Sequence, residues 1–328
     1  NKGVLVVGDI IEGKLAAITA EMLGAGKKLA DKLGEPLCAA LLGSGVKGLA
    51  AEAIAFGASK VFVVDDANLK DYQSDAYVVA AESVIKAANP RIVLMGQSTM
   101  GRDLAPRLAF RFNTAISMDC VDLDVDANKL LVQTRPVYGG NARAIFTTEA
   151  LPQMATVRVK AMTALPRDAA KTGEVVDVAS GIDPAKIKTK FVKKVKEEVA
   201  GVKLEDAPAV IAGGRGIGNA EGFKQLEELA KLFKGAVGAT RPAVDNGWVP
   251  ASIQVGLTGK IVAPELYIAI ALSGSSQHMA GCSGSKTIVA INKDPESNIF
   301  REARFGIVGD WKQALPAFTA KVKELMKE

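Results

Sequence analysis

The sequence has few of the residues that build metal centres, disulfide frameworks or acid–base catalytic sites. Of its 328 residues, three are cysteine and one is histidine. Cys38, Cys120 and Cys282 are far apart and form no CxxC pair, so this chain alone cannot supply a disulfide framework, a tetrahedral zinc site or an iron–sulfur cluster. We therefore expect reduced, mostly buried thiols and no metal site.

Aromatic residues, net charge and long apolar runs are also scarce. Aromatic residues make up 5% of the chain and the formal net charge is +5. A nucleic-acid-binding protein needs stacking platforms and a dense basic surface, so nucleic acid is not an expected partner. No uncharged apolar run reaches the roughly 18 residues of a membrane span, and the first residues show no secretory signal pattern. We expect neither a membrane span nor a targeting segment.

The chain does contain the alternating pattern of an α/β protein. Its length exceeds what one hydrophobic core usually supports, so two domains are expected. Up to about residue 112, β-branched runs such as GVLVVGD and KVFVVDD alternate with alanine-rich stretches of helical period, the last over 101–112. This alternation predicts βαβ units and a parallel sheet. From Thr114 four strand patterns follow without helices, the last being QMATVRVK, which predicts an antiparallel meander that closes the first domain.

A change in composition marks the expected domain boundary. The stretch from Pro166 to Pro208 is rich in charge and turn residues. We place the N-terminal domain at 1–195, the C-terminal domain at 205–328 and the boundary within 180–208. Six lysines between 186 and 196 invite a phosphate-binding interpretation, but their alternation with Phe191, Val192 and Val195 favours a strand with a solvated face over 188–198.

The second domain restarts the alternation of strands and helices. Strand patterns occur in APAVIAGG, GAVGAT, IQVG, KIVAPELYIAIALSG and TIVAINKD, and a helix is expected over 219–234 with Asn219 as its N-cap. Each strand pattern ends in a glycine-rich or polar loop. Because ligands of open parallel sheets bind outside the carboxyl ends of the strands, these loops predict a single crevice.

Individual loop residues leave alternatives open. The glycines over 213–218 suit either phosphate binding or a tight turn, and their spacing is not the GxGxxG fingerprint. Arg241, stiffened by the proline that follows, can act as a fixed cation over a ligand or pair with Asp245 on the surface. A lone histidine such as His278 is more often structural than catalytic. No carboxylate or cysteine joins it in an acid–base set, so we predict no catalytic residue.

Two long stretches carry a family resemblance. VGLTGKIVAPELYIAIALSGSSQHMAG and SKTIVAINKDPESNIFREARFGIVGD, preceded by GGRG and TRPAVDNGW, closely resemble the FAD-binding region of electron transfer flavoprotein alpha subunits. The N-terminal half, including GRDLAPRLA, is similar to the first domain of that family. The resemblance implies an α/β fold: an N-terminal parallel α/β domain closed by an antiparallel meander, and a C-terminal Rossmann-like FAD-binding domain.

The resemblance also implies a set of FAD contacts. The family's arginine matching Arg241 lies near the flavin ring, its histidine matching His278 lies near the pyrimidine carbonyl, and Asn292 and Asp310 match positions used for the adenosine half. Leu257 departs from the glutamine of many members, which puts its contact in doubt, and Thr240 replaces a common serine. The full implied set is Arg215, Thr240, Arg241, Val255, Gly256, Leu257, Thr258, Ser273, Gly274, Ser275, Ser276, Gln277, His278, Asn292, Asp310 and Trp311.

The partners implied are those of an electron carrier. Family members form a heterodimer with a smaller beta subunit, in which AMP or a second FAD is expected, and pass electrons from an acyl-CoA dehydrogenase to a quinone reductase. A bifurcating relative would instead oxidise NADH, with ferredoxin and an acyl-CoA dehydrogenase as acceptors. A cytoplasmic, prokaryotic member is favoured over a mitochondrial matrix protein. The other classes considered are a non-redox adenine-nucleotide-binding module and, with less support, a small-molecule dehydrogenase.

Overall fold

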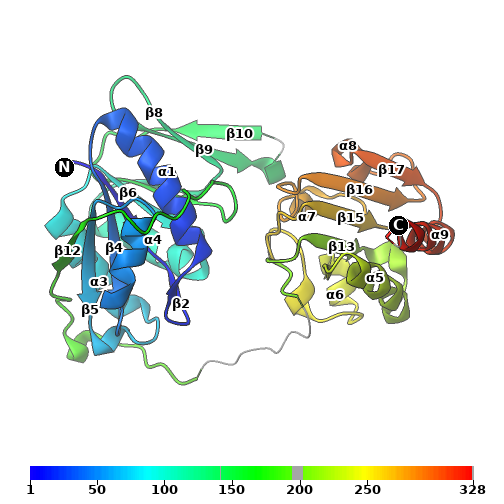
Figure 1. The fold of residues 1–328 in the computed structure, drawn as a ribbon, viewed down its shortest axis with the longest axis horizontal. Helices are drawn as coiled ribbons and strands as arrows, with labels where there is room; N and C mark the ends of the chain where they lie inside the picture. Colours follow the sequence, from blue (N-terminus) through cyan, green and yellow to red (C-terminus); the bar gives the residue numbers. More distant parts are fainter. Residues whose placement is uncertain (141, 194–201, 327–328) are drawn as a thin grey trace. The chain divides into compact units, whose positions relative to one another are not determined.

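The protein consists of two compact units (Figure 1). The structure is a computed structural model that describes residues 1–140, 142–193 and 202–326. The first unit comprises Asn1–Val137 with Ala142–Lys194, and the second comprises Tyr138–Asn141 with Val195–Glu328. Each unit is built on its own parallel sheet. Both sheets follow the strand–helix alternation of the sequence.

The first unit contains a seven-stranded parallel sheet in the order β12-β5-β4-β1-β6-β11-β7. Its strands are β1 (Val4–Val7), β4 (Leu37–Gly43), β5 (Lys60–Asp65), β6 (Ile92–Gly96), β7 (Ile116–Cys120), β11 (Gln153–Val157) and β12 (Glu174–Asp177). The chain runs from β1 outward to β5, then returns to β6 on the other side of β1. The switch point of this sheet therefore lies between β1 and β6.

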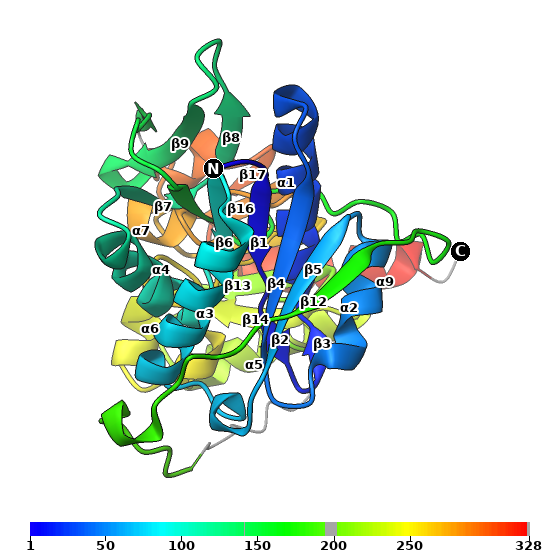
Figure 2. The same ribbon diagram turned by 90° about the vertical axis from the view of Figure 1, so that its left-hand side faces the viewer.

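Helices cover both faces of that sheet, as Figure 2 shows. Helices α1 (Ala17–Leu33) and α2 (Ala50–Ala55) share one core with Val4 and Val6, whereas α3 (Ser74–Ala88) and α4 (Thr99–Arg111) share another with Leu5 and Val7. A strand covered on both faces is apolar at every position. This explains why β1 is a continuous apolar run rather than an alternating one.

The predicted antiparallel meander forms only in part. Strands β8 (Asp122–Val125), β9 (Leu131–Val137) and β10 (Ala142–Phe146) make a separate three-stranded antiparallel sheet. The fourth predicted strand, at Gln153–Val157, instead inserts between β6 and β7 in the parallel sheet. All five of its residues are buried, and the parallel sheet is the environment that covers both faces of a strand. A short hairpin, β2 (Ile10–Ile11) with β3 (Lys14–Leu15), follows β1.

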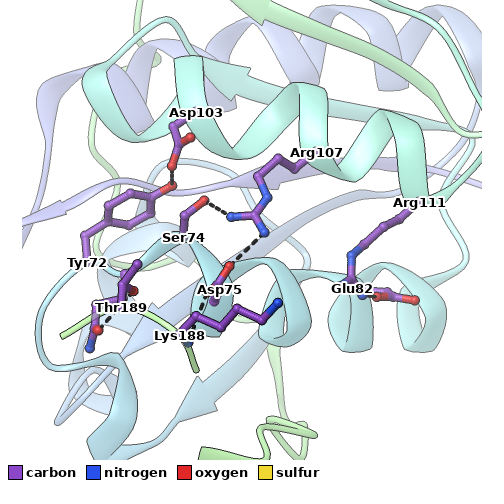
Figure 3. Close-up of polar contacts among 10 residues, drawn as sticks. Tyr72, Ser74, Asp75, Glu82, Asp103, Arg107, Arg111, Lys188 and Thr189 are labelled. Atoms are coloured by element: carbon purple, nitrogen blue, oxygen red, sulfur yellow. Dashed lines mark hydrogen bonds and ion pairs between the residues drawn. The ribbon is translucent and has the colours of Figure 1, made fainter. Parts of the chain in front are cut away.

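The strand predicted over 188–198 is wrong for its described part. Residues 188–193 have no regular secondary structure, and 194–198 lie outside the described residues. The Lys188 backbone N–H instead donates to the Asp75 carboxylate at 3.2 Å, and the Thr189 hydroxyl bonds the Gln73 side chain at 3.3 Å (Figure 3). These side-chain acceptors replace a strand partner.

Further ion pairs and hydrogen bonds connect helices α3 and α4 and the residue Tyr72, and Figure 3 also shows them. Arg107 of α4 donates to Asp75 at 2.9 Å and also to Ser74, and Arg111 pairs with Glu82. The Tyr72 hydroxyl donates to Asp103 at 2.7 Å. Helix α3 is thereby tied both to α4 and to the segment that ends the first unit.

The second unit contains a five-stranded parallel sheet in the order β14-β13-β15-β16-β17. Its strands are β13 (Ala209–Gly213), β14 (Ala236–Ala239), β15 (Leu266–Ile270), β16 (Thr287–Asn292) and β17 (Phe305–Val308). Its helices are α5 (Ala220–Leu232), α6 (Arg241–Asp245), α7 (Ser276–Met279), α8 (Ile299–Glu302) and α9 (Trp311–Leu325). The predicted Asn219 cap is confirmed, since its side chain accepts from the Gly222 N–H at 2.9 Å. The predicted strand IQVG is reduced to two isolated bridges, Ala239 with Gln254 and Val255 with Lys260.

The α/β fold class predicted from the sequence is confirmed in both units. Within the described residues, no helix is both long and apolar enough to cross a membrane. Over the same residues, no group of three or more histidine, cysteine, aspartate or glutamate side chains is placed to hold a metal ion.

Candidate functional site

The carboxyl ends of the five strands of the second unit bring most of the predicted FAD contacts to one edge. The chain moves from β13 to β14 on one side and then crosses to β15 on the other, so the switch point lies between β13 and β15. Arg215 follows β13, Thr240 follows β14, and the loop of residues 273–278 follows β15. Asn292 ends β16 and Asp310 lies just beyond β17. The loops that were expected to form a single crevice therefore lie on one edge of this sheet.

Backbone hydrogen bonds add the segment 255–258 to the same edge. The Val255 N–H donates to the Ala239 carbonyl at 2.9 Å, and the Leu257 N–H donates to the Gln277 carbonyl at 2.7 Å. Between them, Gly256 has φ 142°, and a Cβ there would lie 3.0 Å from the Gln277 carbonyl oxygen. Only glycine allows this close approach. The segment thus packs directly against the 273–278 loop.

The edge presents cationic and hydroxyl groups suited to a phosphorylated cofactor. Arg215 and Arg241 are exposed, as are Ser273 and Ser275. Guanidinium groups and hydroxyls are ordinary ligands of a diphosphate. The arrangement therefore offers positive charge and donors without any acid–base pair.

Thr240 provides an independent sign that a ligand belongs here. It is 8% exposed, and among the described residues its hydroxyl oxygen has no hydrogen-bond partner. Thr240 is the N-cap of α6, where a threonine hydroxyl usually accepts from the helix backbone, yet it makes no such bond. A buried hydroxyl without a partner costs free energy that a bound group can recover. The residue therefore fits the FAD contact implied for it.

Arg241 pairs with Asp245 on the surface, which is one of the two alternatives that the sequence left open. Its Nε lies 3.3 Å from the Asp245 carboxylate, and the two side chains are 67% and 61% exposed. A pair this exposed contributes little stability. Both side chains are accordingly free to reorganise when an anion is bound.

His278 is turned into the core rather than toward solvent. It is 5% exposed, its Nε2 lies 2.8 Å from the Tyr267 hydroxyl, and its Nδ1 lies 3.1 Å from the Val255 carbonyl oxygen. Burial lowers the pKa of His278 to about 4, so the imidazole is neutral at physiological pH. That His278 donates to a flavin carbonyl stays a prediction, and it would require the ring to give up one of these two bonds.

Asn292, Asp310 and Trp311 hold the loops of this edge together. The Asn292 amide donates to the Leu272 carbonyl at 2.8 Å, and its oxygen accepts from the Asp294 N–H at 3.0 Å. Asp310 caps α9, and the Trp311 indole donates to the Gly216 carbonyl at 3.1 Å. In the described structure, these side chains already have protein partners, which does not test their predicted role toward the adenosine half.

The sequence analysis missed Tyr267 and Ser297. Tyr267 is fully buried in β15, where the only signal was a hydroxyl within an apolar strand pattern. The Ser297 hydroxyl donates to the Ser273 carbonyl and accepts from Asn292, both at 3.2 Å. No spacing rule predicts that contact, because it depends on how two loops pack.

Two surface hollows of the first unit, of about 460 and 500 Å³, are lined by none of the predicted residues. The smaller lies beside the start of α1 and is lined mainly by alanine, leucine and glycine. The larger lies between α3, α4 and the segment 181–188, where Arg107 and Arg111 are already paired with carboxylates. The edge of the second sheet remains the stronger candidate.

A doubly wound parallel sheet with glycine-rich, cationic loops at its carboxyl edge defines an α/β protein of the nucleotide-binding type. Comparison with known proteins narrows this class. The electron transfer flavoprotein domain matches residues 4–182, and the electron transfer flavoprotein FAD-binding domain matches residues 203–283. The chain belongs to the electron transfer flavoprotein family and matches its alpha subunits.

Three relatives illustrate the range of that family. An electron transfer flavoprotein subunit alpha of Thermoanaerobacterium thermosaccharolyticum is 43% identical, covering 99% of this chain and 98% of the relative. One of Megasphaera elsdenii is 44% identical over 98% of this chain and 97% of the relative. The lactate dehydrogenase (NAD(+),ferredoxin) subunit LctC of Acetobacterium woodii is 36% identical over 98% of this chain and 77% of the relative. The resemblance seen in the sequence is confirmed over the whole chain.

Proposed function

We propose that this chain carries one FAD on the carboxyl edge of its second sheet and acts as the alpha subunit of a heterodimeric electron carrier. The observation that carries this proposal is the buried Thr240 hydroxyl, which has no hydrogen-bond partner among the described residues and lies on the same sheet edge as exposed Arg215 and Arg241. In this proposal the FAD-binding domain spans 205–328, the domain over 1–195 holds no flavin, and the boundary lies within 180–208.

The proposed residues divide the work of binding. Arg215, Ser273 and Ser275 are exposed polar groups suited to phosphate, and Thr240 supplies a hydroxyl. Arg241 places a positive charge that stabilises a negatively charged, reduced ring. The other residues of the implied set are proposed as further FAD contacts, with His278 at the pyrimidine carbonyl and Asn292 and Asp310 at the adenosine half. Bound FAD supplies reversible electron acceptance, while the protein sets its affinity and potential.

The purified full-length chain, together with its partner, tests this proposal. We expect a yellow protein with one FAD per alpha chain, and weaker FAD binding in Thr240→Val. Thr319→Val is the matched control, because Thr319 is also buried at 7% exposure but lies in α9. A colourless protein that retains AMP or ATP would instead support the nucleotide-binding module.

An exposed sheet edge supports a partner chain. β17 is the last strand of its sheet, and Phe305 and Val308 are each 60% exposed. An uncovered apolar edge strand is a template for association, and soluble proteins usually protect it. We propose that a beta subunit covers part of this unit. A monodisperse, flavin-loaded monomer of this chain in solution would contradict it.

We also propose which proteins donate electrons to this chain and which accept them. The leading route runs from an acyl-CoA dehydrogenase to a quinone reductase. The relative named lactate dehydrogenase (NAD(+),ferredoxin) subunit LctC favours, as a second candidate, a bifurcating complex that oxidises NADH, with a second FAD rather than AMP in the beta subunit. Anaerobic titration of the heterodimer with NADH, with a count of FAD per dimer, separates the two. The bacterial relatives support a cytoplasmic location.

A further inference from the structure

A buried hydrogen-bonded chain lies directly beneath the 273–278 loop. The Tyr267 side chain, 0% exposed, reaches up from β15 to Nε2 of His278 at 2.8 Å. On the other side of the ring, Nδ1 meets the Val255 carbonyl oxygen at 3.1 Å. The imidazole is therefore bonded at both nitrogens, by a side chain from β15 and by the backbone of the segment 255–258.

The chemistry of the two partners determines where the ring proton lies. A backbone carbonyl only accepts hydrogen bonds, so Nδ1 must carry the proton that bonds Val255. In a neutral ring Nε2 is then an acceptor, and the Tyr267 O–H donates to it. The two contacts are compatible only with this tautomer as long as the histidine is uncharged.

We propose that Tyr267 is the positioning residue of His278: its hydroxyl holds Nε2 as an acceptor and, with the Val255 carbonyl, keeps the imidazole neutral and turned into the core. The part of this inference that concerns a flavin rests on the proposed function. The geometry of the ring does not.

The groups around the ring give Tyr267 a second arrangement. The Cys282 thiol is also 0% exposed, and its sulfur lies 3.6 Å from the His278 carbonyl oxygen. Burial, followed by the effect of this thiol, raises the pKa of the Tyr267 hydroxyl. If Nε2 gains a proton, the tyrosine oxygen can accept from it and turn its own O–H toward sulfur. Burial, with a smaller contribution from the Glu302 carboxylate, raises the pKa of Cys282 to about 12. In this proposal the Tyr267 hydroxyl therefore governs both the protonation of Nε2 and the orientation of the His278 ring.

Nuclear magnetic resonance of the ring nitrogens tests this directly. His278 is the only histidine, so a full-length chain labelled with ¹⁵N-histidine and lacking a histidine tag gives a single imidazole. At neutral pH we expect a protonated Nδ1 and an unprotonated, hydrogen-bonded Nε2. A protonated Nε2 in the unmodified protein would overturn the proposal without any variant.

Tyr267→Phe removes the hydroxyl alone. We expect the Nε2 resonance to move to the position of an acceptor without a hydrogen bond, because the only donor to that nitrogen named above is removed. Tyr77→Phe is the control, since Tyr77 is also buried, at 8% exposure, and its hydroxyl bonds the Leu69 carbonyl in the first unit. An unchanged Nε2 resonance in Tyr267→Phe would refute the proposal.

A redox measurement then separates this inference from the proposed function. In the flavin-loaded heterodimer, Tyr267→Phe should shift the flavin reduction potential, whereas Tyr77→Phe should not. No shift would show that the tyrosine positions the ring without affecting a flavin, which refutes the flavin part. If the protein binds no flavin at all, the proposed function fails while the nitrogen resonances still decide the role of Tyr267.

Discussion

The two units share one architecture but differ at the edge where such sheets bind ligands. Each has a doubly wound parallel sheet with a switch point beside its first strand. In the second unit that edge exposes Arg215, Arg241 and two serines. In the first unit the corresponding edge is closed by its own side chains. The same fold therefore provides one candidate site and one packed surface, because function depends on the residues at the edge rather than on the sheet.

The closure of the first edge is visible in its hydrogen bonds. After β1, the Asp9 N–H donates to the Thr19 hydroxyl at 2.9 Å. After β6, the Ser98 hydroxyl caps α4 by accepting from the Gly101 N–H at 3.0 Å, and Gln97 bonds Thr156. These backbone and side-chain groups are thus already paired within the protein, whereas the Oδ1 atom of Asp9 has no partner among the described residues.

The largest expected difference between the units comes from adding one methyl group to each edge. At Gly274, with φ 71°, a Cβ would lie 2.4 Å from the Ile299 nitrogen, and at Gly101 it would lie 1.9 Å from the Gly96 oxygen. Overpacking of this kind costs about 1–3 kcal/mol, with a further 1–3 for the backbone strain at Gly274. Gly274→Ala should lower FAD affinity at least tenfold, whereas Gly101→Ala should destabilise the first unit and leave FAD bound.

Fluorimetric FAD titration and urea unfolding measure these two effects. Gly309→Ala is the control, because a Cβ at Gly309 meets nothing within 4 Å. Loss of FAD in Gly101→Ala at a temperature where the protein stays folded would show that the first edge also takes part in binding.

A second expected effect concerns the buried acid of the closed edge. Asp9 is 5% exposed, and among the described residues its Oδ1 has no hydrogen-bond partner. Burial raises the pKa of Asp9 from 3.8 to about 6, against the opposing effect of a hydrogen bond from Ser98. Above this pKa the folded state holds a buried charge, so the residue destabilises the protein at neutral pH. As the pH falls from about 6 to 4, the folded state takes up the proton first and this penalty disappears.

Asp9→Asn should therefore stabilise the first unit above about pH 7, by up to about 3 kcal/mol for two pKa units. The gain should vanish near pH 4, where the unmodified carboxyl is protonated when folded. Hydrogen exchange of β1 and β6 at the two pH values measures it within that unit. If hydrogen-exchange protection of β1 and β6 at about pH 8 is no higher in Asp9→Asn than in the unmodified protein, the Asp9 charge is stabilised by a partner and the prediction is wrong.

Sequence patterns predicted the elements of both sheets better than they predicted the edges. The βαβ alternation and the Asn219 cap depend on local periodicity and local hydrogen bonds, which a sequence shows directly. The placement of Gln153–Val157 in the parallel sheet does not, because an apolar run of five residues fits either kind of sheet. The loss of the strand at 188–193 likewise depends on Asp75 and Gln73, more than 100 residues away.

The candidate site shows the same limit. The resemblance identified its residues, and the strand ends place them on one edge. The inward orientation of His278 depends on Tyr267, eleven positions away on a buried strand, and on the Val255 carbonyl. Such contacts between segments carry no periodic signal, so the sequence analysis overlooked the tyrosine. The flavin contact that the resemblance implies for His278 stays a prediction.

A smaller effect is expected from the exposed cation of the second edge. Because Arg241 pairs only with exposed Asp245 at 3.3 Å in the described structure, Arg241→Ala should change stability by less than about 0.5 kcal/mol. Its charge near a reduced ring in a largely solvated site is worth about 1 kcal/mol, or roughly 20 mV for two electrons. We expect the flavin potential to fall by that amount. Asp245→Ala, which removes the partner but keeps the cation, should not lower it, and a fall in both variants would argue against the charge.

The smallest expected effect is at Leu257, which is 50% exposed on the same edge. Its backbone N–H is fixed by the Gln277 carbonyl, so a new side chain there changes what the edge presents without moving the loop. Leu257→Gln should change stability by less than about 0.5 kcal/mol, as exposed substitutions usually do. If the side chain faces bound FAD, one added hydrogen bond should strengthen binding by about 0.5–1.5 kcal/mol, a roughly two- to tenfold lower Kd. Leu325→Gln, at 56% exposure in α9, is the matched control and should leave Kd unchanged. An equal Kd for Leu257→Gln, Leu325→Gln and the unmodified protein would remove Leu257 from the proposed contacts and narrow the difference between the two edges to the arginines, Thr240 and the 273–278 loop.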